Sequence, residues 1–167
     1  MNSLKFRNIT ASVDDPVEAW PFEGILGAVE RGTLPDWRRL AAAIRDDPFG
    51  PVAQQVLVAV RLSRPYGTTE LFEEIVKVAR RELAAAEREL VAARVRELVN
   101  QSGLPRSEFA QLVGTSRPRL ATYISGRVVP SAALMVRMGM VTDRARAAAH
   151  RATRGDAPPP EGRDRRS

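Results

Sequence analysis

Apolar residues near the start of the chain recur every three or four positions, which is the spacing of an amphipathic helix. The first such helix is predicted over residues 16–31, with Asp14 or Asp15 as its cap. Pro21 is expected to bend or split this helix, because proline cannot donate the backbone hydrogen bond of a helix interior. Gly32 is expected to end it.

Two further helices follow with the same spacing. Thr33, or the Pro-Asp pair at 35–36, is expected to open the second helix, which turns Trp37 inward. The third is predicted over residues 51–63, a strongly apolar stretch that should lie at the centre of a first domain. The sequence RPYG at 64–67 predicts a turn after it.

A long helix is predicted from Thr68 or Thr69 to about Leu98, a stretch that contains neither proline nor glycine. Its expected buried face is a stripe of apolar residues: Leu71, Ile75, Val78, Leu83, Ala86, Leu90 and Ala93. A helix of this length has to bury its apolar stripe against something. It can lie across the first domain, or pair with the same helix of a second copy in a dimer, and the sequence leaves both arrangements open.

The segment LPRSEFAQLVGTSRPRLATYISGR, residues 104–127, predicts two short helices joined by a glycine. Gly114 is expected to end the first helix, because glycine readily adopts the left-handed conformation that redirects the chain. Thr115 or Ser116 should cap the second helix, and Pro118 falls in its first turn, where the missing N–H has no cost. The positions available for the core are Phe109, Leu112, Val113, Leu120, Tyr123 and Ile124.

Three polar residues of the second helix, Arg117, Arg119 and Thr122, are left on its outer face. A stable core does not need them side by side near a helix start. Two helices joined by a tight glycine turn make a helix-turn-helix, whose second helix can enter the major groove of duplex DNA. A further helix follows over residues 131–141 and should partly bury three residues: Leu134, Val136 and Met138.

The segment SEFAQLVGTSRPRLATYISGR, with the following PSAALMVRM, resembles the lambda-repressor-like DNA-binding domains of Xre-type transcriptional regulators. The shared features are the small residue Ala110, the turn residue Gly114, the spaced apolar positions and the closing pattern YISGRVVPS. The resemblance covers about residues 92–145, with a preceding packing helix at 95–101. Pro118 departs from the polar residue usual at its position. The earlier part, with its WPFEGILGAVERGT start, resembles uncharacterised actinobacterial regulators, which adds no mechanism.

The resemblance implies a DNA-binding role for nine residues of this segment. Phosphate contacts are implied for the two outer arginines and the serines at the helix starts, and base contacts for the two arginines at the start of the second helix, since arginine most often reads guanine. Tyr123 is interpreted as a core residue, with a contact from its hydroxyl to phosphate as the alternative. The predicted DNA-binding residues are Arg106, Ser107, Thr115, Ser116, Arg117, Arg119, Thr122, Tyr123 and Arg127.

The positive charge of the chain is concentrated in the same region. The whole chain carries a net charge of +6. Residues 104–154 hold nine basic and two acidic residues, a net charge of +7, whereas residues 1–66 are neutral and residues 67–103 carry −1. A basic domain attracts polyanions, and each phosphate that it neutralises releases a counterion. The distribution favours nucleic acid, with solvated surface arginines as the alternative interpretation.

Other chemistry finds little support in the sequence. The chain has no cysteine and a single histidine, His150, so no disulfide or zinc site is expected. The acidic pairs at 14–15, 46–47 and 73–74 sit at predicted helix ends, where capping and the helix dipole account for them. We therefore predict no catalytic residues, no cofactor and no metal. Without a signal peptide or a membrane span, a cytoplasmic, nucleoid-associated location is expected.

These patterns predict an all-α fold in four parts: an N-terminal helical domain at 1–67, a long connecting helix that could dimerise at 68–91, a lambda-repressor-like helix-turn-helix bundle at 92–154 and a disordered tail at 155–167. The predicted function is a sequence-specific regulator of transcription that binds double-stranded DNA, acting as a dimeric repressor. One alternative is an antitoxin whose N-terminal domain binds a toxin protein. Another is a protein-interaction module whose helix-turn-helix no longer touches DNA.

Overall fold

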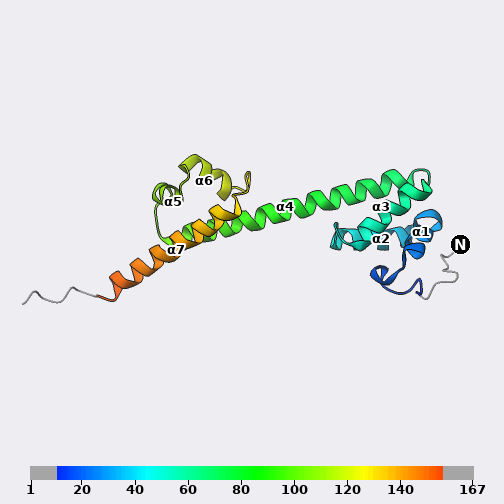
Figure 1. Ribbon diagram of the computed structural model, residues 1–167, viewed down its shortest axis with the longest axis horizontal. Helices are drawn as coiled ribbons and strands as arrows, with labels where there is room; N and C mark the ends of the chain where they lie inside the picture. The colour runs from blue at the N-terminus through cyan, green and yellow to red at the C-terminus, as the bar shows by residue number, and fades with distance from the viewer. Residues whose placement is uncertain (1–10, 156–167) are drawn as a thin grey trace, which may run out of the picture. The chain divides into compact units, whose positions relative to one another are not determined.

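The computed structural model describes residues 11–155, and every regular element in that range is helical (Figure 1). The predicted all-α class is confirmed. The predicted tail, except for Gly155, lies outside the described residues. In chain order the elements are the 3-10 helix η1 (Val17–Ala19) and the α-helices α1 (Phe22–Arg31), α2 (Leu34–Asp46), α3 (Pro51–Ser63), α4 (Thr68–Ser102), α5 (Arg106–Leu112), α6 (Arg117–Ile124) and α7 (Ala132–Thr153).

The chain separates into two compact units, Met1–Ala86 and Glu87–Ser167, and α4 contributes residues to both. In the first unit, η1 and α1–α3 pack with the N-terminal half of α4. In the second unit, the C-terminal half of α4 packs with α5, α6 and α7. Each unit therefore has an apolar core of its own, as a compact domain requires.

The start of the first unit follows the prolines of the sequence. Pro21 splits the predicted first helix into η1 and α1, as expected. The predicted capping by Asp14 or Asp15 is wrong, because prolines occupy the capping position of both η1 and α1. The Asp15 carboxylate instead accepts a hydrogen bond from the backbone N–H of Ser12 at 2.7 Å, so it shapes the preceding turn.

The second helix begins at the threonine predicted as one of its two alternative starts. Both the backbone N–H and the hydroxyl of Thr33 donate to Asp36 Oδ2, at 2.8 and 2.7 Å. Both bonds end on one carboxylate oxygen, and they satisfy a backbone donor and a hydroxyl at the start of the helix. Directly after Asp36, Trp37 packs edge-on against Phe72 with ring centroids 6.3 Å apart, and its Nε1–H donates to the carbonyl of Ala28. Helix α2 is thereby fixed to both α1 and α4.

The buried face of α4 differs from the predicted stripe. In the first unit the helix buries Phe72, Val76 and Ala79, whereas the predicted Leu71 is 42% exposed. In the second unit it buries Ala92, Val95, Leu98 and Val99, and the predicted Leu90 is 71% exposed. The prediction was wrong because α4 carries apolar residues on two adjacent faces. Burial selects the face that holds the bulky Phe72 ring, which spacing alone does not reveal.

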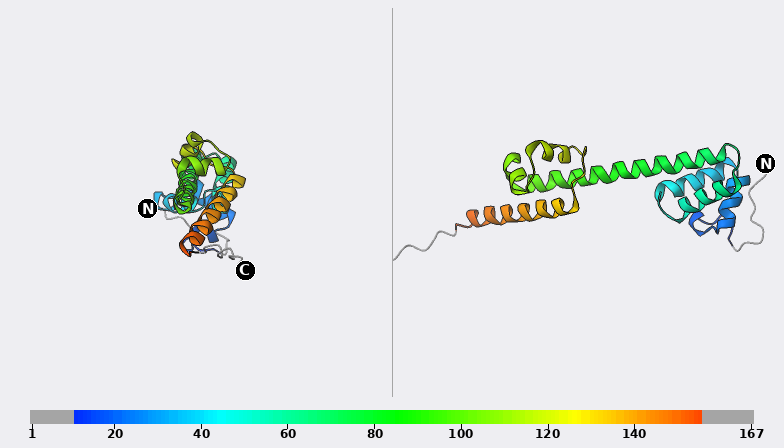
Figure 2. Two further views of the ribbon diagram at one scale, coloured as in Figure 1. Left: turned by 90° about the vertical axis from the view of Figure 1, so that its left-hand side faces the viewer. Right: turned by 45° about the horizontal axis from the view of Figure 1, so that its top comes forward.

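Helix α7 is longer than its predicted span. It begins after Ser131, whose hydroxyl accepts a hydrogen bond from the N–H of Leu134 at 3.2 Å. It then continues past residue 141 to Thr153 (Figures 1 and 2). Its N-terminal half enters the core through Met138, but Val136, which was predicted to be partly buried, is 65% exposed. The Ala- and Arg-rich sequence beyond residue 143 favours continuation of the helix through intrinsic propensity.

Candidate nucleic-acid interface

The turn between α5 and α6 is closed by two backbone hydrogen bonds around a left-handed glycine. Gly114 has φ +74°. Its N–H donates to the carbonyl of Gln111 at 3.1 Å, and the N–H of Thr115 donates to the carbonyl of Ala110 at 2.9 Å. These two bonds form the Schellman motif, which satisfies the last carbonyls of a helix and reverses the chain direction. The glycine-hinged helix pair expected from the sequence is thus present.

The two short helices lie side by side on the C-terminal half of α4, as both figures show (Figures 1 and 2). The second core buries Phe109 of α5, Val113 directly after that helix, and Leu120 and Tyr123 of α6. Leu112, which was predicted to be available for the core, is instead 54% exposed. The other face of α6 carries no residue of this core, and Arg117, Pro118 and Ala121 are exposed there.

Arginine side chains from neighbouring helices hold this pair in place. Arg137 Nη1 on α7 donates to the carbonyl of Val113 at 3.0 Å, beside the glycine turn. Arg96 Nη1 on α4 donates to the carbonyl of Ile124 at 2.9 Å, at the end of α6. Sequence reasoning missed both roles. No local signal could have identified them, because the acceptors are backbone carbonyls 24 and 28 residues away along the chain.

The start of α6 carries the residues predicted to read DNA. Ser116 is the N-cap, and its hydroxyl accepts a hydrogen bond from the N–H of Arg119 at 3.3 Å. Pro118 is in the first turn, where it displaces no helix hydrogen bond. Arg117 and Arg119 are both exposed. Thr122 is half-buried and its hydroxyl donates to the carbonyl of Arg119 at 2.7 Å, which commits its only proton to the helix backbone.

The remaining predicted residues surround this helix in different settings. Arg106 is the first residue of α5, and both it and Ser107 are exposed. Thr115 is half-buried in the turn. Arg127 follows α6, is exposed, and donates from Nε to the Ser125 hydroxyl at 3.3 Å. Tyr123 is only 7% exposed, which is in keeping with its interpretation as a core residue. The assignment of these residues to DNA contacts stays a prediction.

The arginines around α6 are not neutralised by neighbouring carboxylates. Among the described residues the ion pairs are Lys77–Glu74, Arg94–Glu97 and Arg96–Glu89, all on α4. The four arginines of the predicted site take part in none of them. Their charge therefore remains available to an anionic partner.

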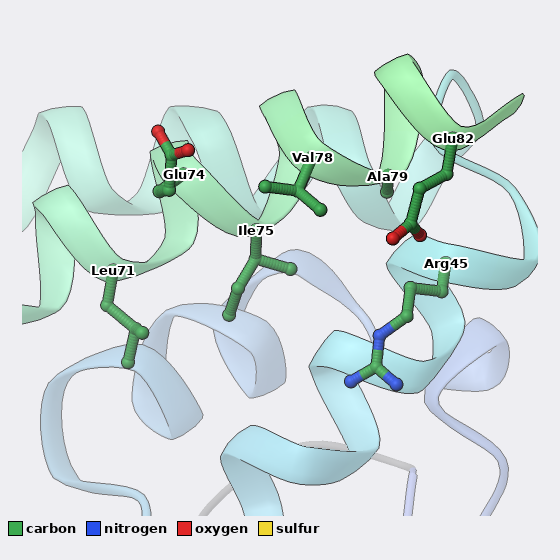
Figure 3. Close-up of a pocket in the computed structure, with 7 residues that line it drawn as sticks. All are labelled: Arg45, Leu71, Glu74, Ile75, Val78, Ala79 and Glu82. Carbon is green, nitrogen blue, oxygen red and sulfur yellow. The ribbon is translucent and has the colours of Figure 1, made fainter. Parts of the chain in front are cut away.

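The first unit contains an open apolar groove, which is the other candidate binding site (Figure 3). Leu71, Ile75 and Val78 of α4 line it, and Arg45 of α2 reaches along one side. Glu74 at its edge is paired with Lys77 at 2.9 Å, and this hydrogen bond lowers the pKa of the Glu74 carboxyl. The residues that line the groove are apolar except for Arg45, Glu74 and Glu82.

The described residues, 11–155, contain neither a candidate metal site nor a candidate membrane-spanning helix. No group of His, Cys, Asp or Glu side chains in that range could hold a metal ion. None of the helices there combines the length and the apolar character needed to cross a membrane.

Comparison with protein-family models places a helix-turn-helix domain in the second unit. The matched residues are 90–152, which include the end of α4, all of α5 and α6, and nearly all of α7. Comparison with curated proteins found no match, and neither did comparison with solved structures. The match supports a DNA-binding regulator at the level of a helix-turn-helix domain. The matched family is described only as a helix-turn-helix domain, so the Xre type stays a prediction. The match begins after the N-terminal unit, so the resemblance of the first part also stays a prediction.

Proposed function

We propose that this chain is a sequence-specific regulator of transcription, which binds double-stranded DNA in the cytoplasm through α6 and represses by occupying a promoter. The observation that carries the proposal is the start of α6. Arg117 and Arg119 are exposed there, without an ion pair among the described residues, on a helix fixed by a buried opposite face. An α-helix fits the major groove, where arginine pairs with guanine through two hydrogen bonds.

In this proposal the residues around α6 position the helix on the duplex. Arg106, at the start of α5, and Arg127, after α6, contact backbone phosphates, together with the hydroxyls of Ser107 and Ser116. Phosphate contacts set register and orientation, and base contacts carry the sequence information. The net charge of +7 on residues 104–154 supports such a division of roles.

The proposed regulator acts as a dimer that pairs through the groove of the first unit. Leu71 is 42% exposed there, and Ile75 and Val78 are half-buried beside it. Covering these side chains with a second copy would remove apolar surface from water, which is the main driving force for association. Two-fold dimers of helix-turn-helix proteins bind half-sites about 34 Å apart on the duplex.

Mutations in α5 and α6 test the DNA contacts. Duplexes enriched from a random pool by the purified chain serve as targets, and shuffled duplexes measure non-specific binding. Arg119→Ala and Arg117→Ala should each reduce the preference for the enriched duplex, by roughly 1–3 kcal/mol for a bidentate contact. Arg106→Ala should weaken binding to both duplexes alike. Arg61→Ala, which removes an exposed arginine from α3, is the control. If variants of both classes bind like the parent, the site assignment is wrong.

Sedimentation velocity tests the dimer. The parent should sediment as a dimer, and Leu71→Asp should give a monomer because it places a charge in the apolar groove. Leu62→Asp is the matched control, since Leu62 is 67% exposed near the end of α3 and does not line the groove. A monomeric parent, or an unchanged Leu71→Asp dimer, would contradict this interface. Co-purification of the chain with the product of a neighbouring gene, abolished by Leu71→Asp, would favour the antitoxin alternative.

A further inference from the structure

One arginine of the proposed reading helix is anchored to the protein core. Arg119 and Tyr123 are four residues apart on α6 and therefore share a face of the helix. The Nε–H of Arg119 donates to the Tyr123 hydroxyl oxygen at 3.1 Å, and the Arg119 Cζ lies 5.4 Å from the centroid of the Tyr123 ring. Tyr123 is 7% exposed and belongs to the second core, whereas Arg119 is exposed. A fixed aromatic ring thus holds one edge of an accessible guanidinium.

The contact with Tyr123 leaves the terminal N–H donors of Arg119 available to a base. A guanidinium has five N–H donors, and the Tyr123 hydroxyl takes the one on Nε. No described residue accepts a hydrogen bond from the two terminal nitrogens of Arg119. Those nitrogens form a planar fork that matches the O6 and N7 acceptors of guanine end-on. The anchored side chain therefore keeps a complete bidentate pair for a partner.

The other two arginines proposed to contact DNA from α6 and the residues after it, Arg117 and Arg127, lack an equivalent anchor. The Arg117 side chain is exposed and donates to no described residue. Arg127 donates to the Ser125 hydroxyl at 3.3 Å, but Ser125 is itself exposed at the end of α6. A free arginine loses most of its rotamer freedom when it binds, and this loss weakens the contact. A pre-organised arginine gives up less.

We propose that Tyr123 is a positioning residue, whose hydroxyl holds Arg119 for an end-on bidentate contact with a guanine and makes Arg119 the principal base-reading residue. This inference rests on the proposed function. It gives Tyr123 a different task from a direct phosphate contact, since the hydroxyl acts on specificity through Arg119. It also ranks the two arginines of α6, because only one of them is held in place.

Tyr123→Phe isolates the hydroxyl, because it keeps the buried ring and its contact with the guanidinium. The parent and variants are titrated with the enriched duplex and with single-base-pair variants of it. The base pair read by Arg119 is the one whose substitution no longer matters in Arg119→Ala. Tyr123→Phe should reduce discrimination at that base pair by about threefold to tenfold, the share of one hydrogen bond. The double variant with Tyr123→Phe and Arg119→Ala should discriminate at that base pair as Arg119→Ala does alone.

The other tyrosine of the chain, Tyr66, provides the matched control. Tyr66 is fully exposed between α3 and α4, and Tyr66→Phe should leave all affinities unchanged. In the free protein, the Nε–H resonance of Arg119 should shift and exchange faster with water in Tyr123→Phe but not in Tyr66→Phe. Thermal unfolding of each variant confirms that the fold is retained, so that a change in discrimination reports positioning.

The outcomes separate this inference from the function on which it rests. If Tyr123→Phe discriminates like the parent, or binds every duplex more weakly by the same factor, the positioning role is wrong and the proposed regulator function is unaffected. An unchanged Arg119 Nε–H resonance in the free variant overturns it without reference to DNA. A parent chain that prefers no duplex contradicts the proposed function itself, and the inference falls with it.

Discussion

The glycine hinge gives a sharp test of the local structure, because two of the left-handed glycines in the second unit have different surroundings. Gly114 has φ +74° and Gly103 has φ +67°. A Cβ at Gly103 would meet nothing within 4 Å, whereas a Cβ at Gly114 would lie 3.1 Å from Arg137 Nη1. Gly103→Ala should therefore show only the cost of a left-handed alanine, about 1–2 kcal/mol. Gly114→Ala should show the same cost plus a disturbed Arg137 side chain.

The additional loss of stability in Gly114→Ala should not exceed the contribution of the hydrogen bond that Arg137 makes. The guanidinium would have to move by a few tenths of an ångström away from the carbonyl of Val113, which it contacts at 3.0 Å. Weakening this bond should cost about 0.5–1 kcal/mol, within the usual range for one hydrogen bond. The gain from restricting the unfolded chain is the same for both alanines and cancels in the comparison.

Urea and thermal unfolding of the full chain, followed by circular dichroism, measure the two variants. Tryptophan fluorescence identifies the transition of the first unit, because Trp20 and Trp37 both belong to it. A difference of 1 kcal/mol in the free energy of unfolding shifts the midpoint of thermal unfolding by roughly 4–8 °C for a unit of this size. Equal stability of Gly114→Ala and Gly103→Ala would refute the reasoning. So would a difference that persists when both are made in an Arg137→Ala background.

Three further perturbations test the supports of the site and its outer face. Ser116→Ala removes the cap of α6 and should lower the free energy of unfolding by about 0.5–2 kcal/mol in urea titrations; stability equal to the parent would show that this cap is unimportant. Arg96→Ala removes the hydrogen bond to the end of α6 and should lower the free energy of unfolding by about 0.5–1.5 kcal/mol in the same titration. Arg94→Ala breaks only an exposed ion pair and should change it by no more than about 0.5 kcal/mol. The reverse order would contradict the assigned contacts. Thr142→Val removes the hydroxyl that bonds the carbonyl of Leu98 from α7, and calorimetry should show a loss of about 1 kcal/mol; no change would mean that this bond does not fasten α7.

Local signals in the sequence were sufficient for most helix boundaries. The third helix spans Pro51–Ser63, as the break before it and the turn after it predict. Thr33 and Ser116 act as caps because their hydroxyls reach a group within the next turn, and Gly114 ends α5 because of its own backbone freedom. Each of these features depends on residues no more than five positions apart, which a sequence displays directly.

The features that the sequence did not predict depend on contacts between distant segments. The buried face of α4 was misassigned because both faces are apolar, and packing against the first core, including Trp37 of α2, selects Phe72 over Leu71. Arg137 looked like one more surface charge until α7 was placed beside the turn. The anchoring of Arg119 is intermediate, because its four-residue spacing from Tyr123 and the core position of that ring can be read from the sequence, but the hydrogen bond between the two side chains cannot.

The salt dependence of DNA binding by the unmodified chain tests the central claim most directly. The dissociation constants for the enriched duplex and for a shuffled duplex are measured between 50 and 200 mM salt. The enriched duplex should bind at least about a thousandfold more tightly. Arg106 and Arg127 of two protomers should contact four phosphates, which gives a slope of roughly −3.6 in a plot of log affinity against log salt. Equal affinities for the two duplexes, or affinities indifferent to salt, would contradict the claim that α6 meets DNA.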